Sequence, residues 1–466
     1  MRVNRAKRDR LRDGHSLSLL LSVWGYRFML LLVMTVCVGK LDVLQITFRT
    51  GGCLSLMVVY AVGLIMLQKV YHACAVGQAR VTELVMSQAL AASIGAVVMY
   101  FGAALYLHKL FNPLGLMVAV VVQILLGVVW SVASNKFYYK HRRQSRTVVI
   151  CQSKEEYEQL CMTPYFFDKY DVIRIVIGQT EDAQVLGEQL EGCETVFTLN
   201  LPATLTHVVS KLCLEKGIVG YFVPRLGHII MAGAQFQSGF NMPLLRVERA
   251  GSHSEYRFFK RMFDIVCSFM GMIALSPVML ATAIAIKAED HGPVFYRQVR
   301  LTKNGREFNI LKFRSMTVNA EKDGVARLAG ENDSRITKVG HFIRACRIDE
   351  LPQLINILLG DMSIVGPRPE RPEIARQYED TLPEFYLRLQ VKAGLTGLAQ
   401  VYGRYNTEPY NKLQMDLMYI NEMSLLKDLQ LILATIKILF LKDSNQGIAQ
   451  GQETALKATD SKGKSA

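Results

Sequence analysis

The stretch Arg344–Pro369, RACRIDELPQLINILLGDMSIVGPRP, decides how the C-terminal part of this chain folds. Leucine and isoleucine recur at helical spacing after Asp349-Glu350, and Pro352 is tolerated only in a first helical turn, where its missing N–H needs no partner. We therefore expect a short helix with Asp349 at or near its N-cap. There the carboxylate would accept backbone N–H groups and feel the positive end of the helix dipole, so we expect it to stay ionised.

An isolated Asp-Glu pair ahead of a helix is usually a cap beside a solvated charge. Here guanidinium groups stand on both sides of the pair: Arg344, Arg347 and, between two prolines, Arg368. Two carboxylates among arginines are typical of a phosphate site built for chemistry. We expect Asp349 to act as the nucleophile and Glu350 to bind a divalent cation, because hard cations prefer oxygen ligands and suit a diphosphate substrate.

The same stretch closely resembles the bacterial sugar transferases that load a sugar 1-phosphate onto a polyprenyl phosphate. Four separated blocks carry the resemblance in order and spacing: Gly292–Gln298 (GPVFYRQ), Lys312–Met316 (KFRSM), Asp349–Pro369 and Gly394–Val401 (GLTGLAQV). The resemblance covers residues 255–440. The long, membrane-bearing N-terminus is similar to the larger branch of the family, exemplified by undecaprenyl-phosphate glucose and galactose phosphotransferases.

The resemblance implies an enzyme that transfers a sugar 1-phosphate from a UDP-sugar to undecaprenyl phosphate and releases UMP, the first step of exopolysaccharide, capsule or O-antigen synthesis. Glucose is the expected sugar and galactose the alternative. The family assigns the matching dyad to a covalent aspartyl intermediate on Asp349 and a magnesium ligand, Glu350. Contacts to phosphate or uridine are expected from Arg344, Arg368, Lys312, Arg314 and Arg347. Relatives commonly have other residues at positions 347 and 348, so Arg347 is either an extra phosphate contact or merely exposed.

The composition is that of a membrane protein, because 50% of the 466 residues are hydrophobic. Four apolar stretches have the length of a bilayer span: 17–39, 52–68, 82–107 and 114–134. Basic residues precede the first stretch and follow the last, so an even number of spans places both flanks on the cytoplasmic side of a bacterial inner membrane. We expect a transmembrane domain at 1–146, with the first helix retained and not removed as a signal peptide.

The net charge of +14 predicts contact with anionic lipid and phosphorylated substrates, because the basic residues lie beside apolar segments and are not interleaved with stacking aromatics. Nucleic acid is therefore not an expected partner. The nine cysteines contain no Cys-x-x-Cys pair and the nine histidines show no ligand spacing. Neither a disulfide framework nor a zinc site is expected.

Residues 147–250 predict a small Rossmann-like α/β domain. Apolar runs at 147–151, 172–177, 195–199 and 219–223 read as buried strands with helical patterns between them. The first turn, Cys151–Glu155, lacks the glycines that let backbone N–H groups approach a pyrophosphate. We expect a structural or regulatory module that binds no dinucleotide, within a chain that forms a homodimer.

Residues 251–443 predict the catalytic domain, with a re-entrant membrane helix at 262–286 that is broken at Ser276-Pro277. Cationic residues flank this segment on both sides, so a helix that returns to the cytoplasmic face satisfies both flanks. A kinked crossing helix is the alternative. Lys260 and Arg261, at the mouth of the helix, suit the polyprenyl phosphate headgroup, and Asp264 lies near its start. The tail at 444–466 is expected to be disordered.

Two other functions compete with sugar phosphate transfer. A non-catalytic scaffold of a polysaccharide assembly complex would need neither the Asp349-Glu350 pair nor its arginines. A membrane-anchored nucleotide-sugar epimerase or dehydratase would need a glycine-rich turn at the start of the α/β segment, and Cys151–Glu155 contains no glycine.

Overall fold

The computed structural model describes residues 2–39, 52–77, 79–141, 144–163, 166–178, 182–237, 242–249, 254–318, 335–403 and 408–439. These residues form two compact units, Met1–Val223 and Pro224–Ala466. The second unit begins before residue 250, so the described part of 224–249 folds with it and not with the α/β sheet. The predicted disordered tail lies outside the described residues.

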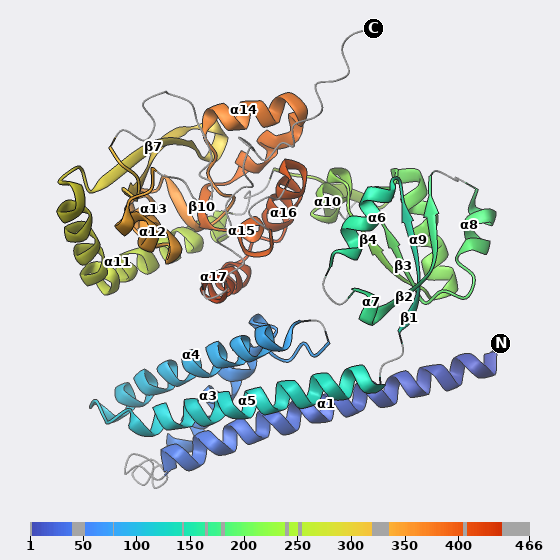
Figure 1. Ribbon diagram of the computed structural model, residues 1–466, viewed down its shortest axis with the longest axis horizontal. Helices are drawn as coiled ribbons and strands as arrows, with labels where there is room; N and C mark the ends of the chain where they lie inside the picture. Colours follow the sequence, from blue (N-terminus) through green and yellow to red (C-terminus); the bar gives the residue numbers. More distant parts are fainter. Residues whose placement is uncertain are drawn as a thin grey trace. The chain divides into compact units, whose positions relative to one another are not determined.

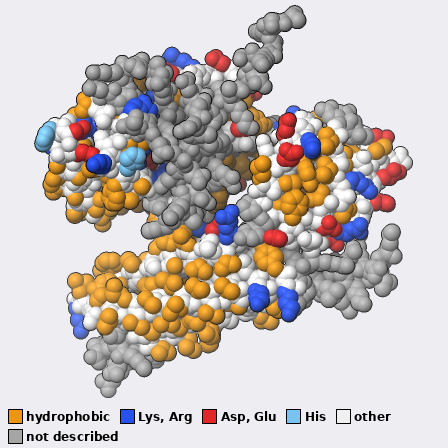
Figure 2. Space-filling view, in the orientation of Figure 1, with side chains coloured by type: hydrophobic (Ala, Val, Ile, Leu, Met, Phe, Trp, Pro, Cys, Tyr) orange, Lys and Arg blue, Asp and Glu red, His pale blue; other side chains and the backbone are white. Residues whose placement is uncertain are grey.

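Four apolar helices begin the first unit (Figure 1): α1 (Arg2–Gly39), α3 (Gly52–Val70), α4 (Val81–Leu107) and α5 (Leu114–His141). Among the described residues, α1, α4 and α5 each contain a segment long and apolar enough to cross a membrane, whereas α3 contributes a shorter one, Ser55–Val70. Hydrophobic side chains cover the visible surface of these helices (Figure 2), and Phe101 and Val129 are more than half exposed. Such a surface suits lipid as its solvent.

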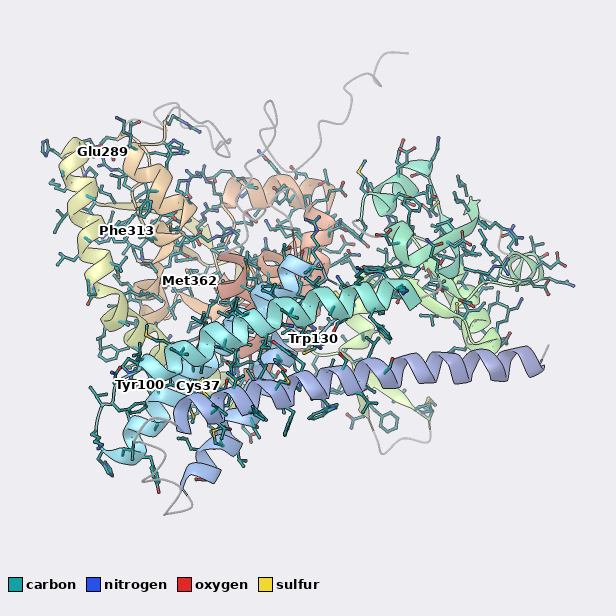
Figure 3. All side chains as sticks on the ribbon, turned by 60° about the horizontal axis from the view of Figure 1, so that its bottom comes forward. Cys37, Tyr100, Trp130, Glu289, Phe313 and Met362 are labelled. Carbon is teal, nitrogen blue, oxygen red and sulfur yellow. The ribbon has the colours of Figure 1, made fainter. Side chains whose placement is uncertain are left out.

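Polar side chains inside this helical part bond to one another. The Gln123 amide donates to the Leu30 carbonyl at 2.9 Å, and the Tyr60 hydroxyl donates to Gln123 Oε1 at 3.2 Å. Trp130, labelled in Figure 3, stacks on Tyr26 with ring centroids 4.6 Å apart. A buried amide is costly unless it is bonded, so these contacts favour one packing of α1, α3 and α5.

The α/β part of the first unit is a parallel sheet of four described strands: β1 (Ser145–Cys151), β2 (Tyr170–Ile177), β3 (Thr195–Thr198) and β4 (Val219–Phe222). All four predicted strands are confirmed. Their order, β2-β1-β3-β4, is that of flavodoxin-like sheets, whereas the Rossmann order runs 3-2-1 before strand 4. Apolar runs in the sequence predict where buried strands lie along the chain. The order of the strands in the sheet depends on which way each connection crosses, and apolar runs carry no information about that direction.

Helices cover both faces of this sheet because successive side chains of a strand point to opposite faces. Side chains of α6 (Lys154–Cys161) pack with Val149 and Cys151. Side chains of α8 (Ala183–Gln189) and α9 (Ala203–Lys216) pack with Val148 and Ile150 on the other face. The short helix α7 (Phe166–Lys169) leads into β2.

The second unit combines helices with pairs of strands. Its described strand pairs are antiparallel β5 (Gln235–Gln237) with β6 (Leu244–Arg246), antiparallel β7 (Phe295–Leu301) with β8 (Glu307–Phe313), and parallel β9 (Met362–Val365) with β10 (Ala393–Thr396). Its described α-helices are α10 (Leu226–Ala232), α11 (Ser254–Asp290), α12 (Lys338–Ala345), α13 (Gln353–Leu359), α14 (Pro372–Thr381), α15 (Leu398–Tyr402), α16 (Pro409–Asn421) and α17 (Leu425–Leu439). The 3₁₀ helices are η1 (Lys303–Gly305), η2 (Ile348–Glu350) and η3 (Pro383–Gln390).

The core of the second unit gathers side chains from α13, both strands of the β9–β10 pair, η3 and α16. Ile357, Met362, Phe385, Leu413 and Leu417 are buried there almost completely. Burial of these side chains holds η2, which precedes α13, and the loop after β9 on one scaffold. The predicted dyad and Arg368 lie on those two segments.

Helix α11 runs continuously through Pro277 and bends along its length (Figure 1). It is itself apolar and long enough to cross a membrane. Its first half packs Phe263 and Cys267 against the core, and its second half packs Ile286 beside Phe313. Both halves therefore lie against the same unit, while the re-entrant path through lipid stays a prediction.

Candidate active site

Asp349 and Glu350 lie on η2, a single 3₁₀ turn between α12 and α13. Arg347 precedes this turn with a φ of 53°, in the left-handed region that non-glycine residues seldom adopt. Such backbone strain gathers at functional sites, where it fixes a side-chain direction. The strained residue lies two positions before Asp349, the first residue of the predicted dyad.

The predicted N-cap role of Asp349 is wrong. Helix α13 begins at Gln353 with Pro352 at its N-cap, and no side chain caps it. Asp349 lies within the 3₁₀ turn that ends at Glu350, three residues before Pro352, so the residue spacing that suggested a cap does not produce one. Among the described residues, no hydrogen bond or ion pair reaches the Asp349 carboxylate.

Three cations surround the Glu350 carboxylate, whose side chain is 12% exposed. Its Oε1 accepts from Lys312 Nζ and from Arg368 Nη2, each at 3.2 Å, and its Oε2 lies 3.8 Å from Arg347 Nη1. The predicted residues Lys312, Arg347 and Arg368 therefore come together on one carboxylate, from β8, the turn before η2 and the loop after β9. Arg347 was expected either to contact phosphate or to be merely exposed. Its side chain is partly buried and faces Glu350, which disfavours the second alternative.

The two carboxylates differ in their pKa. Burial acts to raise the pKa of Glu350, but Lys312, Arg368 and Arg347 outweigh burial and hold it well below its usual range. Burial and the neighbouring Glu350 charge raise the pKa of Asp349, and the charges of Lys312, Arg344 and Arg368 offset only part of that increase. Asp349 is thus less readily ionised than an ordinary aspartate, opposite to the direction expected from helix capping.

Arg344 belongs to the same surroundings through its charge on Asp349. Together with Lys312, Arg347 and Arg368 it gives the two carboxylates an excess of positive charge. A buried region of this kind attracts a substrate that carries several negative charges.

Asn356 is a site residue that the sequence interpretation missed. Its Oδ1 accepts from the Leu311 N–H at 2.9 Å, and its Nδ2 donates to the Asn309 carbonyl at 2.9 Å. The amide thus joins α13 to β8 at the residue before Lys312, which sets Lys312 against Glu350. The signal was a single asparagine inside an apolar helical run, since a buried amide must find partners.

The loop that carries Arg368 is held against β10 through backbone groups. The Gly366 N–H donates to the Thr396 carbonyl at 2.8 Å, and the Gly394 N–H donates to the Pro367 carbonyl at 2.9 Å. A Cβ on Gly394 would lie 2.1 Å from Gly366 N, so this close approach requires glycine. The two sequence blocks Gly366–Pro369 (GPRP) and Gly394–Gly397 (GLTG) therefore contact each other through their backbones.

Arg314 lies apart from this cluster. It is 7% exposed and forms an ion pair with Asp290 at the end of α11, and none of its described contacts reaches Glu350. Its predicted phosphate contact stays a prediction, and its observed contact joins β8 to α11. Glu289, labelled in Figure 3, joins α11 to the start of α12 by accepting the Lys338 N–H at 2.9 Å.

The residues predicted for the lipid headgroup have partners inside the second unit. Lys260 Nζ lies 2.6 Å from Asp428 Oδ2, and Arg261 donates to the Ile357 and Leu358 carbonyls at 2.6 and 2.8 Å. The buried Asp264 carboxylate accepts from Ser363 Oγ at 3.1 Å and from the Ile364 N–H at 3.0 Å. The headgroup role stays a prediction, and it requires Lys260 and Arg261 to share or exchange these contacts. Ser276 Oγ, beside Pro277, donates to the Ile273 carbonyl at 2.8 Å.

Comparison with known proteins connects this site to a family. The family described as bacterial sugar transferase matches residues 255–442. A Caulobacter vibrioides protein described as a UDP-glucose:undecaprenyl-phosphate glucose-1-phosphate transferase is 42% identical over 190 residues, 40% of this chain and 71% of that protein. The chain belongs to the bacterial sugar transferase family. The matched region contains α11, η2 and the Arg368 loop.

Two further relatives of this sugar transferase are matched over a smaller part of their length. A UDP-glucose:undecaprenyl-phosphate glucose-1-phosphate transferase of Klebsiella pneumoniae is 44% identical over 183 residues, 38% of this chain and 39% of that protein. An undecaprenyl-phosphate galactose phosphotransferase of Salmonella typhimurium is 38% identical over 214 residues, 43% of this chain and 44% of that protein. The similarity to these relatives thus spans less than half of their length.

Proposed function

We propose that this protein is a phosphoglycosyl transferase that moves a sugar 1-phosphate from a UDP-sugar to undecaprenyl phosphate and releases UMP. The observation that carries the proposal is the cluster of Lys312, Arg347 and Arg368 on Glu350, directly beside Asp349. A scaffold protein has no need for this cluster. Membership of the bacterial sugar transferase family and the names of the relatives support the same reaction.

The proposed chemistry has two displacements. In the first, an Asp349 carboxylate oxygen attacks the phosphorus next to the sugar, the bond from that phosphorus to the UMP oxygen breaks, and UMP leaves with the electron pair. In the second, an oxygen of the lipid phosphate attacks the same phosphorus and the bond to Asp349 breaks, which restores the carboxylate. Each displacement brings only one anionic partner to the site, so repulsion between the two substrates is avoided.

The residues of this site fit a magnesium ion that protein and substrate hold jointly. Among the described residues no group of three acidic, His or Cys side chains can hold a metal alone. Mg²⁺ is commonly bound through one or two carboxylates together with substrate phosphates, and Glu350 offers such a carboxylate in ionised form. When bound, the ion would neutralise charge on the diphosphate. Arg344, Arg347 and Arg368 would orient the same phosphates through their N–H donors.

The sugar is proposed to be glucose, with galactose as the alternative. Relatives described as glucose-1-phosphate transferases are 44% and 42% identical to the matched part of this chain, and one described as a galactose phosphotransferase is 38% identical. The described side chains of the site are cations and carboxylates, which suit phosphate groups and do not distinguish one hexose from another. A screen of UDP-sugars with undecaprenyl phosphate, read by mass spectrometry, decides between them.

The proposed setting is the cytoplasmic face of a bacterial inner membrane, with α11 as a re-entrant helix. A straight helix of 37 residues would be about 55 Å long. Yet Lys260 near its start pairs with Asp428, and Asp290 at its end pairs with Arg314, both in the second unit. Large side chains on its free surface, such as Phe269 and Leu280, are more than half exposed. These contacts favour a helix that enters the lipid and returns over one that crosses it.

Assembly is the remaining part of the proposal. We retain the homodimer expected from the sequence, and the mass of the purified protein in detergent tests it. A measured mass equal to that of one chain would contradict the homodimer and would leave the proposed role of Asp349 unchanged.

Intact-mass analysis tests the proposed chemistry. Wild-type protein mixed with UDP-glucose and Mg²⁺, without lipid, should gain the mass of one glucose phosphate. Asp349→Asn should gain none, because an amide cannot make this attack, and it should also show no turnover. An adduct on Asp349→Asn, or full activity of that variant, would remove Asp349 from the reaction. UDP-galactose replaces UDP-glucose in a parallel sample.

A further inference from the structure

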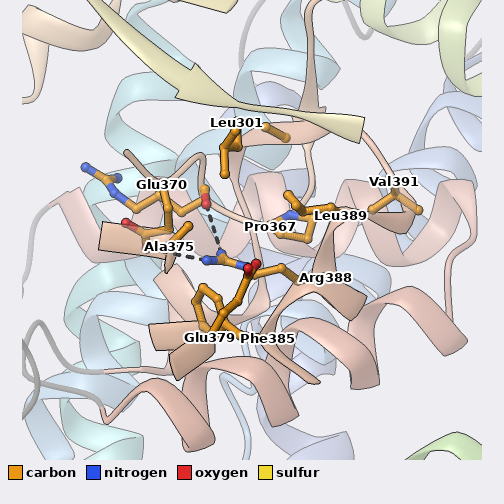
Figure 4. A pocket seen from close by; sticks show the side chains of 11 residues that line it. Leu301, Pro367, Glu370, Ala375, Glu379, Phe385, Arg388, Leu389 and Val391 are labelled. Atoms are coloured by element: carbon orange, nitrogen blue, oxygen red, sulfur yellow. Dashed lines mark hydrogen bonds and ion pairs between the residues drawn. The ribbon is translucent and has the colours of Figure 1, made fainter. Parts of the chain in front are cut away.

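A second group of charged side chains, two of them buried and two partly buried, lies beside the Arg368 loop. It contains Glu370 from the chain just after that loop, Arg388 from η3, and Lys412 and Asp416 from α16. Arg388 and Asp416 side chains are each 2% exposed. Figure 4 shows Arg388 between Glu370 and the Phe385 ring, and its guanidinium carbon lies 4.8 Å from the centre of that ring.

Arg388 joins the members of this group. Its Nη2 lies 2.8 Å from Asp416 Oδ2, its Nη1 donates to Glu370 Oε1 at 3.4 Å, and Glu370 also pairs with Lys412. Lys412 and Arg388 together hold the pKa of Glu370 below its usual range, although burial acts to raise it. Burial opposes charge on the other members, since it raises the pKa of Asp416 and lowers the pKa of Lys412. Charged groups placed this way are costly unless the geometry of their contacts compensates.

The same guanidinium also reaches the backbone of the site. Arg388 Nη2 donates to the Arg368 carbonyl at 2.9 Å. The next two carbonyls are held as well, since Arg300 Nη1 donates to the Pro369 carbonyl at 3.1 Å and the Leu301 N–H donates to the Glu370 carbonyl at 3.0 Å. Hydrogen bonds thus hold three successive carbonyls of the loop, while the Arg368 side chain reaches Glu350.

The cavity beside Arg388 is too small to be a ligand site that would explain these charged side chains. The cavity, lined by Leu301, Pro367, Glu370 and Arg388 among others, has a volume of about 10 Å³, enough for no more than one water molecule. No substrate fits there. The buried charges therefore act on the loop and not on a second ligand.

We propose that Arg388 is a positioning residue, which holds the Arg368 backbone so that the Arg368 guanidinium faces Glu350 and the substrate phosphates. Asp416 and Glu370 orient Arg388, and Lys412 balances their charge. The inference rests on the proposed phosphoglycosyl transferase function for its activity readout. Because phosphoryl transfer depends on placement, a loop shift of about 1 Å can cost about 100-fold in rate.

A double-mutant cycle tests this role in the full chain. The rate of adduct formation from UDP-glucose is measured for the wild type, Arg388→Lys, Arg368→Ala and the double variant. Lysine keeps the charge but cannot bond two carboxylates and a carbonyl as a fork. We expect Arg388→Lys to lose at least about tenfold in the wild-type background and almost nothing further in Arg368→Ala, because contacting residues are not additive. Additive losses would overturn the proposal.

Hydrogen exchange supplies a readout that does not depend on activity. Amides of the peptide that spans Gly366–Glu370 should exchange faster in Arg388→Lys, while those of α12 and η2 stay as in the wild type. Asp416→Asn, which keeps the side-chain shape, should show the same pattern more weakly if Arg388→Lys folds poorly. Unchanged exchange in the loop of both variants would contradict the positioning role.

The matched control is Arg306→Lys, because Arg306 is exposed and forms an ion pair with Asp361 at 2.8 Å. It should leave both the adduct rate and loop exchange near the wild-type values. If the wild type itself forms no adduct, the proposed function fails, and the exchange experiment still decides whether Arg388 holds the loop.

Discussion

Two short turns of this molecule each present a glutamate close to a helix start, with different chemistry around it. After β1, the Glu156 carboxylate accepts the Gln152 N–H at 3.0 Å and Asn200 Nδ2 at 2.9 Å. On η2, the Glu350 carboxylate accepts from Lys312 and Arg368 with Arg347 nearby. Glu156 thus has neutral donors, and Glu350 has cations.

The difference separates a structural turn from a candidate active site. Neutral donors complete a helix start: Ser153 Oγ accepts the Glu156 N–H at 3.4 Å and Glu156 closes the turn from the other side. Such a turn offers no excess of positive charge to an anionic ligand. Around Asp349 and Glu350 the cations exceed the carboxylates in number, so a phosphorylated substrate gains from binding there.

Removal of the divalent cation should have the largest effect. We expect chelation of Mg²⁺ to stop transfer to the lipid and also the exchange of labelled UMP into UDP-sugar without acceptor, because diphosphate charge is then not neutralised. Added Mg²⁺ should restore both. Exchange that requires added polyprenyl phosphate would favour a ternary complex over the proposed two displacements.

The next largest effect should come from Glu350→Gln. The amide keeps the shape but loses the charge that faces three cations, and we expect a loss of about 100-fold or more in adduct formation, comparable to removal of a main electrostatic group from an active site. Glu156→Gln is the matched control and should keep the wild-type rate. A comparable loss in Glu156→Gln would mean that the α/β turn takes part in the reaction.

Much of this comparison could be predicted from the sequence. The arginines around Asp349-Glu350 identified the site because they lie close along the chain, and the apolar runs identified the strands. The partner of Lys260 could not be predicted, because Asp428 lies far along the chain and meets it only through packing of α11 on α17. The left-handed backbone conformation of Arg347 could not be predicted either, since arginine has no preference for it. Because the chain turns at this residue, Asp349 does not lie at the expected N-cap.

The bend in α11 offers a test of the membrane placement of the site. We expect Ser276→Leu with Pro277→Leu to straighten the helix, because proline costs about 3 kcal/mol in a helix interior and leucine favours both helix and lipid. The double variant should lose activity although Asp349 and Glu350 are unchanged. Cysteine labelling after Lys287 should report the cytoplasmic side in the wild type and a shift in the variant. Labelling from the periplasm in the wild type would defeat the re-entrant path.

A smaller effect is expected from the buried amide behind Lys312. Asn356→Leu should leave the Leu311 N–H and the Asn309 carbonyl without partners, at a cost of about 1–3 kcal/mol in the free energy of unfolding. We expect a lower melting temperature and a moderate loss of activity as Lys312 moves from Glu350. Asn356→Asp, which keeps the acceptor for Leu311, is the control and should retain more activity. Equal activity in the wild type and Asn356→Leu would show that Lys312 needs no such support.

The smallest expected effect concerns nucleotide binding at the first turn of the α/β sheet, where we expect none. A dinucleotide-binding sheet offers free N–H groups at this turn to a pyrophosphate, but here Glu156 accepts the Gln152 N–H and adds a negative charge. Titration of NAD or NADP into the full chain in detergent should therefore give no binding heat. Glu156→Gln sharpens the test, since it removes the charge while Gln152 and Ser153 side chains still fill the turn, and it too should give none. Micromolar binding to the wild type would return the epimerase alternative and make the first turn a ligand site. Binding only to Glu156→Gln would show instead that one carboxylate is what separates this turn from a phosphate site.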